Sequence, residues 1–308
     1  MEIVTLTLSP AYDVHVYCNT FLAGRENHVK LVSKSSGGKG LNISRALSEY
    51  GIKSHAVMLL GNENCADFEK SVSTENITPC LLKINGRIRE NITVHTADGE
   101  ETRISFDGFS ANSAVLSEIE KMLSLQKGDV LTVTGSIPEG VDIPELKLYL
   151  SKLKKTGVRI VLDSRSLSLS DIEEIKPWLI KPNAEEVSQY LGRDILDVAN
   201  AVSAVRELSR LGAKNVIVSL GGLGAVLAAD GKIFVGKTPK IDVISTIGAG
   251  DSMIAGFIAA AKEENDAIER FRYAIAFGSA ACLSAGTMPP EKNKILSLLN
   301  EIQIHEEN

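Results

Sequence analysis

The chain has 308 residues, of which 44% are hydrophobic and 5% aromatic, and this is enough to bury the core of one large α/β domain. Its formal net charge is −6, so the molecule as a whole has no basic field that would attract a nucleic acid. The four cysteines are scattered, with neither a C-x-x-C pair nor a histidine at ligand spacing, which argues against a zinc site or a disulfide framework.

The first residues of the chain are predicted to form a strand. Residues 1–8 lack the basic and apolar regions of a signal peptide. No stretch of the chain reaches the roughly 18 consecutive apolar residues that cross a membrane. Together with the unpaired cysteines, these features predict a cytoplasmic protein with no membrane partner.

Two β-rich regions lack helical periodicity. The first spans residues 14–32, and the second is a predicted hairpin of Asn91–His95 and Thr102–Phe106 joined across Asp98-Gly99. We expect them to form a small β lid, built from about 14–32 and 88–107, on a single domain that spans 1–308.

The glycine-rich segment Ser36-Gly37-Gly38-Lys39-Gly40 is not a Walker A loop, because Gly40 stands where that loop needs Ser or Thr. It is predicted to be a turn that leads into a helix over about 41–50 and lets the backbone approach a ligand closely. Lys39 and Asn42 would then face the ligand. A glycine-rich entry to an ordinary surface helix is the alternative.

The middle of the chain alternates strands with helices. Strands are predicted at 130–133, 158–162 and 216–220, with helical spacing at 143–155 and 196–211. This order predicts a three-layer α/β fold with a mainly parallel sheet buried on both faces and ligands at the carboxyl ends of its strands.

A further helix is predicted to start after Lys181-Pro182-Asn183, with Glu185 and Glu186 in its first turn. Asn183 and Glu186 lie one turn apart on one face, where they could hold a hydrated Mg²⁺ through its waters. Simple charge complementarity with the helix N-terminus is the alternative.

Gly221-Gly222-Leu223-Gly224 follows a strand and suggests a dinucleotide-binding loop. That loop must open a helix, however, and residues 225–229 continue as another strand with a turn at Asp230-Gly231. The segment is therefore either an approach for a nucleotide phosphate or a structural β-turn.

The strongest local signal is Ser245 to Ser252, which precedes a buried helix at 253–261. Gly248 and Gly250 allow successive amides to converge on an anion at the positive end of the helix. Asp251 at its edge is expected to be kept ionised by the helix dipole and to act as a general base; an ordinary N-cap is the alternative. Residues 306–308 are predicted to be a frayed tail.

These segments occur in the order and spacing of the ribokinase-like, or PfkB, carbohydrate kinases, which the whole chain resembles. The two specific signatures are Ser36 to Leu47 and Ser245 to Gly256. The chain is most similar to the 1-phosphofructokinase and tagatose-6-phosphate kinase branch, as shown by residues 7–13, 89–92 and 134–140.

The resemblance implies an ATP- and Mg²⁺-dependent kinase that phosphorylates a hydroxyl of a phosphorylated hexulose, with Asp251 as the base. By similarity, Gly248, Ala249 and Gly250 form the anion hole. Sugar hydroxyls would be held by Asp13, Gly38, Lys39 and Asn42, and the phosphate already on the sugar by Arg89 and Ser136. The nucleotide side would be lined by Lys181, Asn183, Ser219, Gly221 and Gly224. The lid would join two subunits in a homodimer.

Two positions depart from the phosphofructokinase pattern. His28 follows Asn27 where arginine is usual, and Ser9 replaces asparagine before Pro10. These changes affect the prediction of which sugar is bound more than the prediction of the reaction type. The alternatives are a kinase for an unphosphorylated sugar or nucleoside, against which Arg89 and Ser136 argue, and a sensor that retains the fold without turnover.

Overall fold

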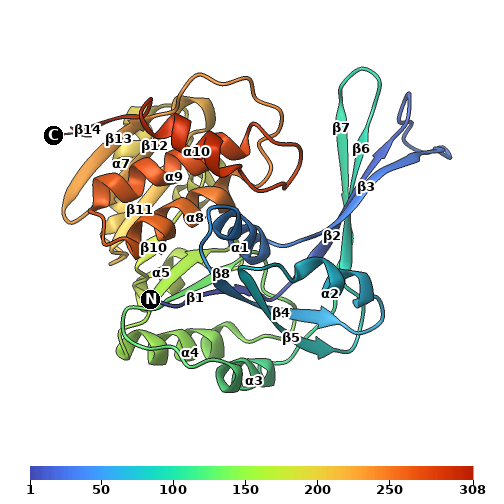
Figure 1. Cartoon of the computed structure of the whole chain (residues 1–308), viewed down its shortest axis with the longest axis horizontal. Helices are drawn as coiled ribbons and strands as arrows, with labels where there is room; N and C mark the ends of the chain where they lie inside the picture. Colours follow the sequence, from blue (N-terminus) through green and yellow to red (C-terminus); the bar gives the residue numbers. More distant parts are fainter. Residues whose placement is uncertain (308) are drawn as a thin grey trace.

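The computed structural model describes residues 1–307 and shows a large α/β body from which a small β-sheet projects (Figure 1). The large sheet has ten strands in the order β14-β13-β12-β11-β10-β9-β8-β1-β4-β5. The seven strands from β11 to β5 are mutually parallel, whereas β12, β13 and β14 are added antiparallel at one edge.

The strands of this sheet are short and largely buried. They are β1 (Ile3–Thr7), β4 (Ser54–Gly61), β5 (Ile77–Ile84), β8 (Val130–Thr134), β9 (Arg159–Asp163), β10 (Leu179–Ile180), β11 (Asn215–Ser219), β12 (Ala225–Ala229), β13 (Lys232–Lys237) and β14 (Gln303–Glu307). Every residue of β1 and of β8 is buried, as expected for central parallel strands covered on both faces.

Helices cover both faces of the large sheet, which confirms the predicted three layers. One face carries α1 (Lys39–Glu49), α8 (Ala249–Lys262), α9 (Ala267–Ala281) and α10 (Lys292–Leu299), whose apolar residues form one core. The other core contains residues of α2 (Ala66–Val72), α3 (Ala114–Met122), α4 (Ile143–Lys155), α5 (Leu169–Ile175), α6 (Ala184–Leu191) and α7 (Val198–Ser209).

The small sheet has four strands in the order β3-β2-β6-β7. They are β2 (Ala11–Tyr17), β3 (Lys30–Gly37), β6 (Arg89–His95) and β7 (Glu101–Ser105). The predicted hairpin of β6 and β7 is confirmed, with Ile92 paired to Ile104. The sheet extends beyond the predicted segments, because β2 starts at Ala11 and β3 continues to Gly37, which leads directly into α1.

The strands predicted at 130–133, 158–162 and 216–220 and the helix predicted at 143–155 are confirmed within a residue at their ends. The helix predicted at 253–261 starts four residues earlier, so Asp251 lies in its first turn. The frayed tail is wrong for Glu306 and Glu307, because β14 pairs with β13 through backbone hydrogen bonds; Asn308 lies outside the described residues. Within residues 1–307, the structure contains no helix long and apolar enough to span a membrane.

Candidate active site

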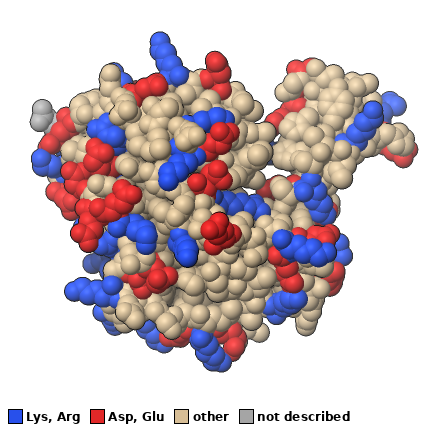
Figure 2. All heavy atoms as spheres, viewed as in Figure 1, with Lys and Arg blue, Asp and Glu red and all other residues tan. Residues whose placement is uncertain are grey.

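A cavity of about 1090 Å³ lies between the carboxyl ends of the parallel strands and the inner face of the small sheet. Figure 2 shows the hollow between the projecting sheet and the larger body. Every site residue proposed from the sequence lines this cavity: Asp13, Gly38, Lys39, Asn42, Arg89, Ser136, Lys181, Asn183, Glu186, Ser219, Gly221, Gly224, Gly248, Ala249, Gly250 and Asp251. Segments from both ends of the chain therefore meet in one place.

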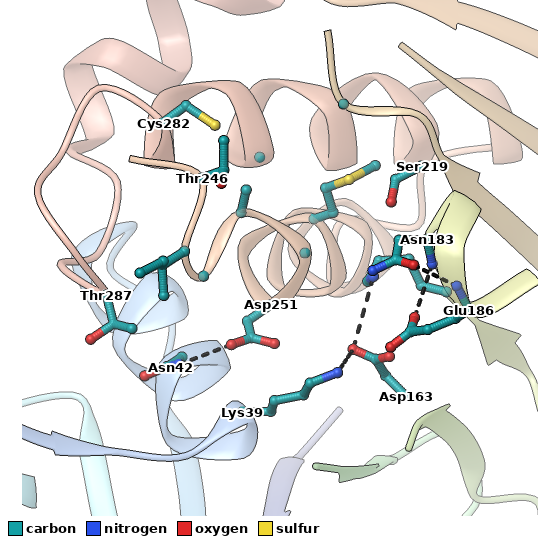
Figure 3. Close-up of a pocket in the computed structure, with 18 of the residues that line it drawn as sticks. Lys39, Asn42, Asp163, Asn183, Glu186, Ser219, Thr246, Asp251, Cys282 and Thr287 are labelled. Atoms are coloured by element: carbon teal, nitrogen blue, oxygen red, sulfur yellow. Dashed lines mark hydrogen bonds and ion pairs between the residues drawn. The ribbon is translucent and has the colours of Figure 1, made fainter. Parts of the chain in front are cut away.

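Asp251 is held in the centre of this cavity by the first turn of α8. Its side chain is only 6% exposed, and Asn42 Nδ2 on α1 donates a 2.9 Å hydrogen bond to Asp251 Oδ2. Figure 3 shows the carboxylate directed between Asn42 and the Lys39–Asp163 pair. One oxygen is thus fixed, and Oδ1 has no hydrogen bond to another residue among those described.

The turn before Asp251 presents backbone amides to the cavity. Gly248 adopts a left-handed conformation (φ 79°) at the start of α8, and the Gly250 and Asp251 amides belong to the first helical turn, where no intrahelical acceptor exists. The Ala249 amide, which the sequence placed in the anion hole, instead donates to the Thr246 carbonyl at 3.3 Å. A Cβ at Gly250 would lie 2.9 Å from Lys181 Nζ, which shows that the Lys181 ammonium group reaches this turn. Amides and ammonium together form an anion-binding corner.

A charged network lies beside Asp251. Lys39 Nζ is 3.1 Å and Lys181 Nζ 3.9 Å from Oδ2 of Asp163, which ends β9. Burial opposes ionisation of Asp163, but the ammonium groups of Lys181 and Lys39 outweigh it and lower the pKa of this carboxyl. Burial acts against the charge of Lys39 as well, yet Asp163, Asp251 and Glu186 raise its pKa overall.

The pKa of Asp251 is raised to about 6. Burial is the main cause and the charge of Asp163 the second, opposed in part by Lys39, Asn42 and Lys181. The sequence predicted an ionised carboxylate at this helix terminus, and with a pKa of about 6 the group is mostly ionised at neutral pH. It accepts a proton far more readily than an exposed aspartate does.

The small sheet contributes a second set of polar groups. Asn91 Nδ2 donates to Asp13 Oδ1 at 3.1 Å, and burial raises the pKa of Asp13 despite Asn91 and the nearby cations. Arg89 and Arg103 line the same cavity from β6 and β7. The Nε of Arg89 is buried without a hydrogen-bond partner. Buried donors normally have a partner, so this one is expected of a residue that donates to a ligand.

On the opposite side of the cavity, Asn183 and Glu186 form a reciprocal capping box at the start of α6. Glu186 Oε2 accepts from the Asn183 amide at 3.0 Å, and Glu186 Oε1 accepts from Arg165 Nε at 2.9 Å. Both carboxylate oxygens are therefore engaged, so contact with a cation through water fits this geometry better than direct ligation. Glu185 and Glu186 also lie in the first turn of α6, where their negative charge complements the helix N-terminus. This is the alternative to a Mg²⁺ site that the sequence analysis gave.

Asp163, Arg165 and Thr287 are among the lining residues of the cavity that were not singled out from the sequence. Asp163 ends the buried strand β9, Arg165 lies two residues after it, and Thr287 comes from the loop between α9 and α10. Asp163 had a usable signal, because it ends a parallel strand and ligands gather at that edge of such sheets. Thr287 had none, since its position depends on how a long loop folds back.

Comparison with known proteins identifies the family of this chain. The profile of the pfkB family carbohydrate kinases matches residues 5–294. The chain belongs to the pfkB family. Among its pfkB relatives, the 1-phosphofructokinase of Bacillus subtilis is 32% identical over 283 residues, which are 92% of this chain and 93% of the relative. The 1-phosphofructokinase of Escherichia coli K12 is 28% identical over 98% of both chains.

Solved structures agree with this family. Phosphofructokinase-2 from Escherichia coli, crystallised in complex with substrates and products, superposes with a TM-score of 0.88 and 28% identity, covering 98% of this chain and 99% of the other. The same enzyme in complex with fructose-6-phosphate gives a TM-score of 0.87, with 27% identity over 97% of this chain and 98% of the other. The ribokinase-like fold expected from the sequence is thereby confirmed.

Proposed function

We propose that this pfkB chain transfers the γ-phosphoryl group of ATP to a free hydroxyl of a ketohexose monophosphate, as a 1-phosphofructokinase does. The proposal rests on one observation: Asp251 and the free amides of its own helical turn lie in the same cavity as Arg89 of the small sheet. A proton acceptor, an anion site and a guanidinium for the substrate's resident phosphate are thus combined.

Asp251 accepts the proton of the attacking hydroxyl. As the hydroxyl oxygen forms a bond to the γ-phosphorus, the bond from that phosphorus to the bridging oxygen breaks and ADP leaves. The hydrogen bond from Asn42 to one oxygen of Asp251 orients the other oxygen for this proton. A pKa of about 6 suits the role, because the base is ionised at neutral pH and still basic enough to accept a proton.

The transferring group is stabilised by charge. The amides of Gly250 and Asp251, with Lys181 at the same corner, face the position where negative charge accumulates. Asp163 holds Lys39 and Lys181 in place, since both ammonium groups approach one of its oxygens. Phosphoryl transfer requires positioning and charge neutralisation more than covalent help from the protein.

The residues present also fit a Mg²⁺ that travels with ATP. Among residues 1–307, no group of three or more histidine, cysteine or acidic side chains forms a metal cage, and Mg²⁺ normally keeps its waters and binds nucleotide phosphates. Asn183 and Glu186, the pair proposed from the sequence, line the cavity together with Asp163, and these side chains would hold its waters. The ion would neutralise charge on the β- and γ-phosphates.

Arg89 and Ser136 are the proposed contacts for the phosphate already on the sugar. The sugar hydroxyls would bind to Asp13, Gly38, Lys39 and Asn42. Fructose 1-phosphate is the first candidate substrate because relatives that cover 92% and 98% of this chain are named 1-phosphofructokinases. Fructose 6-phosphate is the second candidate, since the structural neighbour crystallised with it covers nearly the whole chain. Both reactions yield fructose 1,6-bisphosphate.

The small sheet would act as a lid and as the contact between two subunits. Its outer side exposes Leu31 (66%), Val32 (63%), Phe106 (52%) and Ile104 (40%) to solvent. A small sheet with exposed apolar residues is marginal in water, and a two-fold axis would bury the same residues of both copies. A homodimer through these sheets therefore accompanies the proposed function.

ADP release tests the substrate class. Fructose 1-phosphate, fructose 6-phosphate, tagatose 6-phosphate, fructose and ribose are compared at matched concentration through kcat/KM. The proposal requires at least one phosphorylated ketohexose to exceed both unphosphorylated sugars. A preference for fructose or ribose would instead support a kinase for unphosphorylated sugars, and binding without ADP release would support a sensor.

A further inference from the structure

A second cavity, of about 620 Å³, lies on the other face of the small sheet and shares no lining residue with the first. Side chains alternate between the two faces of a strand. Tyr12 and Glu90 line the second cavity, whereas their neighbours Asp13 and Arg89 line the first. The second cavity is open to solvent and is bordered by residues of β3, α1 and α2 at the base of the projecting sheet.

The cavity has an excess of positive charge. Lys34, Arg45 and Arg87 line it together with two carboxylates, Asp67 and Glu90. Each carboxylate already has a lysine partner: Glu90 is 2.6 Å from Lys34 Nζ, and Asp67 is 3.5 Å from Lys70 Nζ. Neither arginine forms an ion pair with a carboxylate in the part of the chain that the structure describes. The charge of Arg87 is therefore uncompensated, and that of Arg45 is offset only in part by Asp13.

The two arginines differ in a way that suits a ligand site. Arg45 is fixed, because Nη1 donates to the Ser36 carbonyl at 2.6 Å and Nη2 to Ser36 Oγ at 2.8 Å. Burial lowers its pKa, and the charge of Asp13 opposes this only in part, so a nearby anion would relieve an unfavourable desolvation. Arg87 is exposed and has no hydrogen-bond partner among residues 1–307, which leaves its donors open to solvent.

We propose that this cavity is a second anion site, which holds a phosphate group between the guanidinium groups of Arg45 and Arg87. Guanidinium matches phosphate geometry with two parallel hydrogen bonds, and neither guanidinium here is in an ion pair with a carboxylate. The volume of about 620 Å³ accommodates a small phosphorylated metabolite as well as free phosphate.

Occupancy of this site is linked to the sugar side of the first cavity. Arg45 holds Ser36, and the next residue, Gly37, packs so closely against the Asp13 carboxylate that no Cβ would fit between them. Gly38 and Lys39 of the first cavity follow directly. An anion that draws Arg45 away from Ser36 would therefore shift Asp13 and the glycine turn, so the affinities of the two sites depend on each other.

Calorimetric titration with inorganic phosphate and, separately, glycerol 3-phosphate tests the site, with ADP and fructose 1-phosphate at saturation so that the first cavity is filled. Arg87→Gln should weaken binding by at least about tenfold, the loss of one charge-assisted contact, while the matched variant Arg210→Gln, at an exposed arginine outside both cavities, should keep it. Binding of glycerol 3-phosphate without binding of inorganic phosphate would identify a site for a phosphorylated metabolite. Equal affinities for the two ligands would identify a site for phosphate itself. No binding by the wild type, retention in Arg87→Gln, or loss in both variants would overturn the second site.

The linkage is tested by the KM for the sugar phosphate, measured with and without saturating inorganic phosphate. We expect a change of at least about fivefold in the wild type, part of which disappears in Arg87→Gln, whereas the KM for ATP stays the same in both. Simple competition in the first cavity does not depend on Arg87. Identical changes in the two enzymes, or none in either, would contradict the linkage.

Discussion

Asn42 on α1 and Asp251 on α8 are 209 residues apart in the chain, yet the Asn42 amide donates a 2.9 Å hydrogen bond to the Asp251 carboxylate. Each residue lies in one of the two sequence signatures, so this bond joins them physically. It also orients the proposed base. The first turns of two separate helices are thereby fixed against each other at the centre of the cavity.

Replacing Asp251 with asparagine tests the base. Asp251→Asn preserves the volume of the side chain but cannot accept the hydroxyl proton, so kcat should fall by about 10²–10⁴-fold. ATP binding, measured by calorimetry, should persist because the amides of the turn remain. Turnover within about threefold of the wild type would exclude Asp251 as the base.

Arg89→Gln tests the contact with the substrate's own phosphate. The buried Nε of Arg89 has no partner in the described residues, so its contact is expected to form only with the ligand. The KM for the sugar phosphate should rise by about 10–100-fold while the KM for ATP is unchanged. Arg87→Gln, two residues away on the opposite face, is the matched control. Equal effects on both substrates would indicate a folding defect instead.

The pH profile of kcat/KM tests the environment of Asp251. Because burial and Asp163 raise its pKa to about 6, activity should fall as the pH decreases through about 6. Asp163→Asn removes a neighbouring negative charge, which should move this acid limb to lower pH even where total activity drops. An acid limb that stays in place in Asp163→Asn would show that another group controls it.

Asp163→Asn should also destabilise the fold. The change leaves the ammonium group of Lys181, which is only 4% exposed, without its anionic partner. Breaking a buried pair in this way costs about 3–5 kcal/mol. Chemical denaturation measures it, and a double variant with Lys181→Met should recover part of the loss. Wild-type stability in Asp163→Asn would mean that solvent already reaches Lys181.

Ile104→Asp tests the assembly. Ile104 is 40% exposed on the outer side of the small sheet, and a charge there should dissociate the proposed dimer in multi-angle light scattering at micromolar concentration. Leu148→Asp places the same charge at a residue that is 59% exposed on α4 and should leave the dimer intact. A wild-type monomer, with or without sugar phosphate, would contradict the dimer.

The sequence was most informative where structure is set locally. The turn at Gly248 and Gly250, the hairpin across Asp98-Gly99 and the capping box of Asn183 depend on neighbouring residues, and each was predictable. β14 was not, because its acidic residues follow no apolar pattern and the strand is specified by pairing with β13. Asp163 was missed for a similar reason, since its role arises only when Lys39 and Lys181 converge on it from other elements.

Identification of the product by ³¹P NMR is the most direct test of the proposed reaction. ATP is incubated with fructose 1-phosphate, fructose 6-phosphate or tagatose 6-phosphate in separate reactions, with the wild type and, as a control, with Asp251→Asn. We predict that the wild type forms a ketohexose bisphosphate and ADP in equal amounts from at least one of them, fructose 1-phosphate first, and that the control forms almost none. Release of ADP and inorganic phosphate with the sugar unchanged, or no turnover of any ketohexose monophosphate, would contradict the assignment.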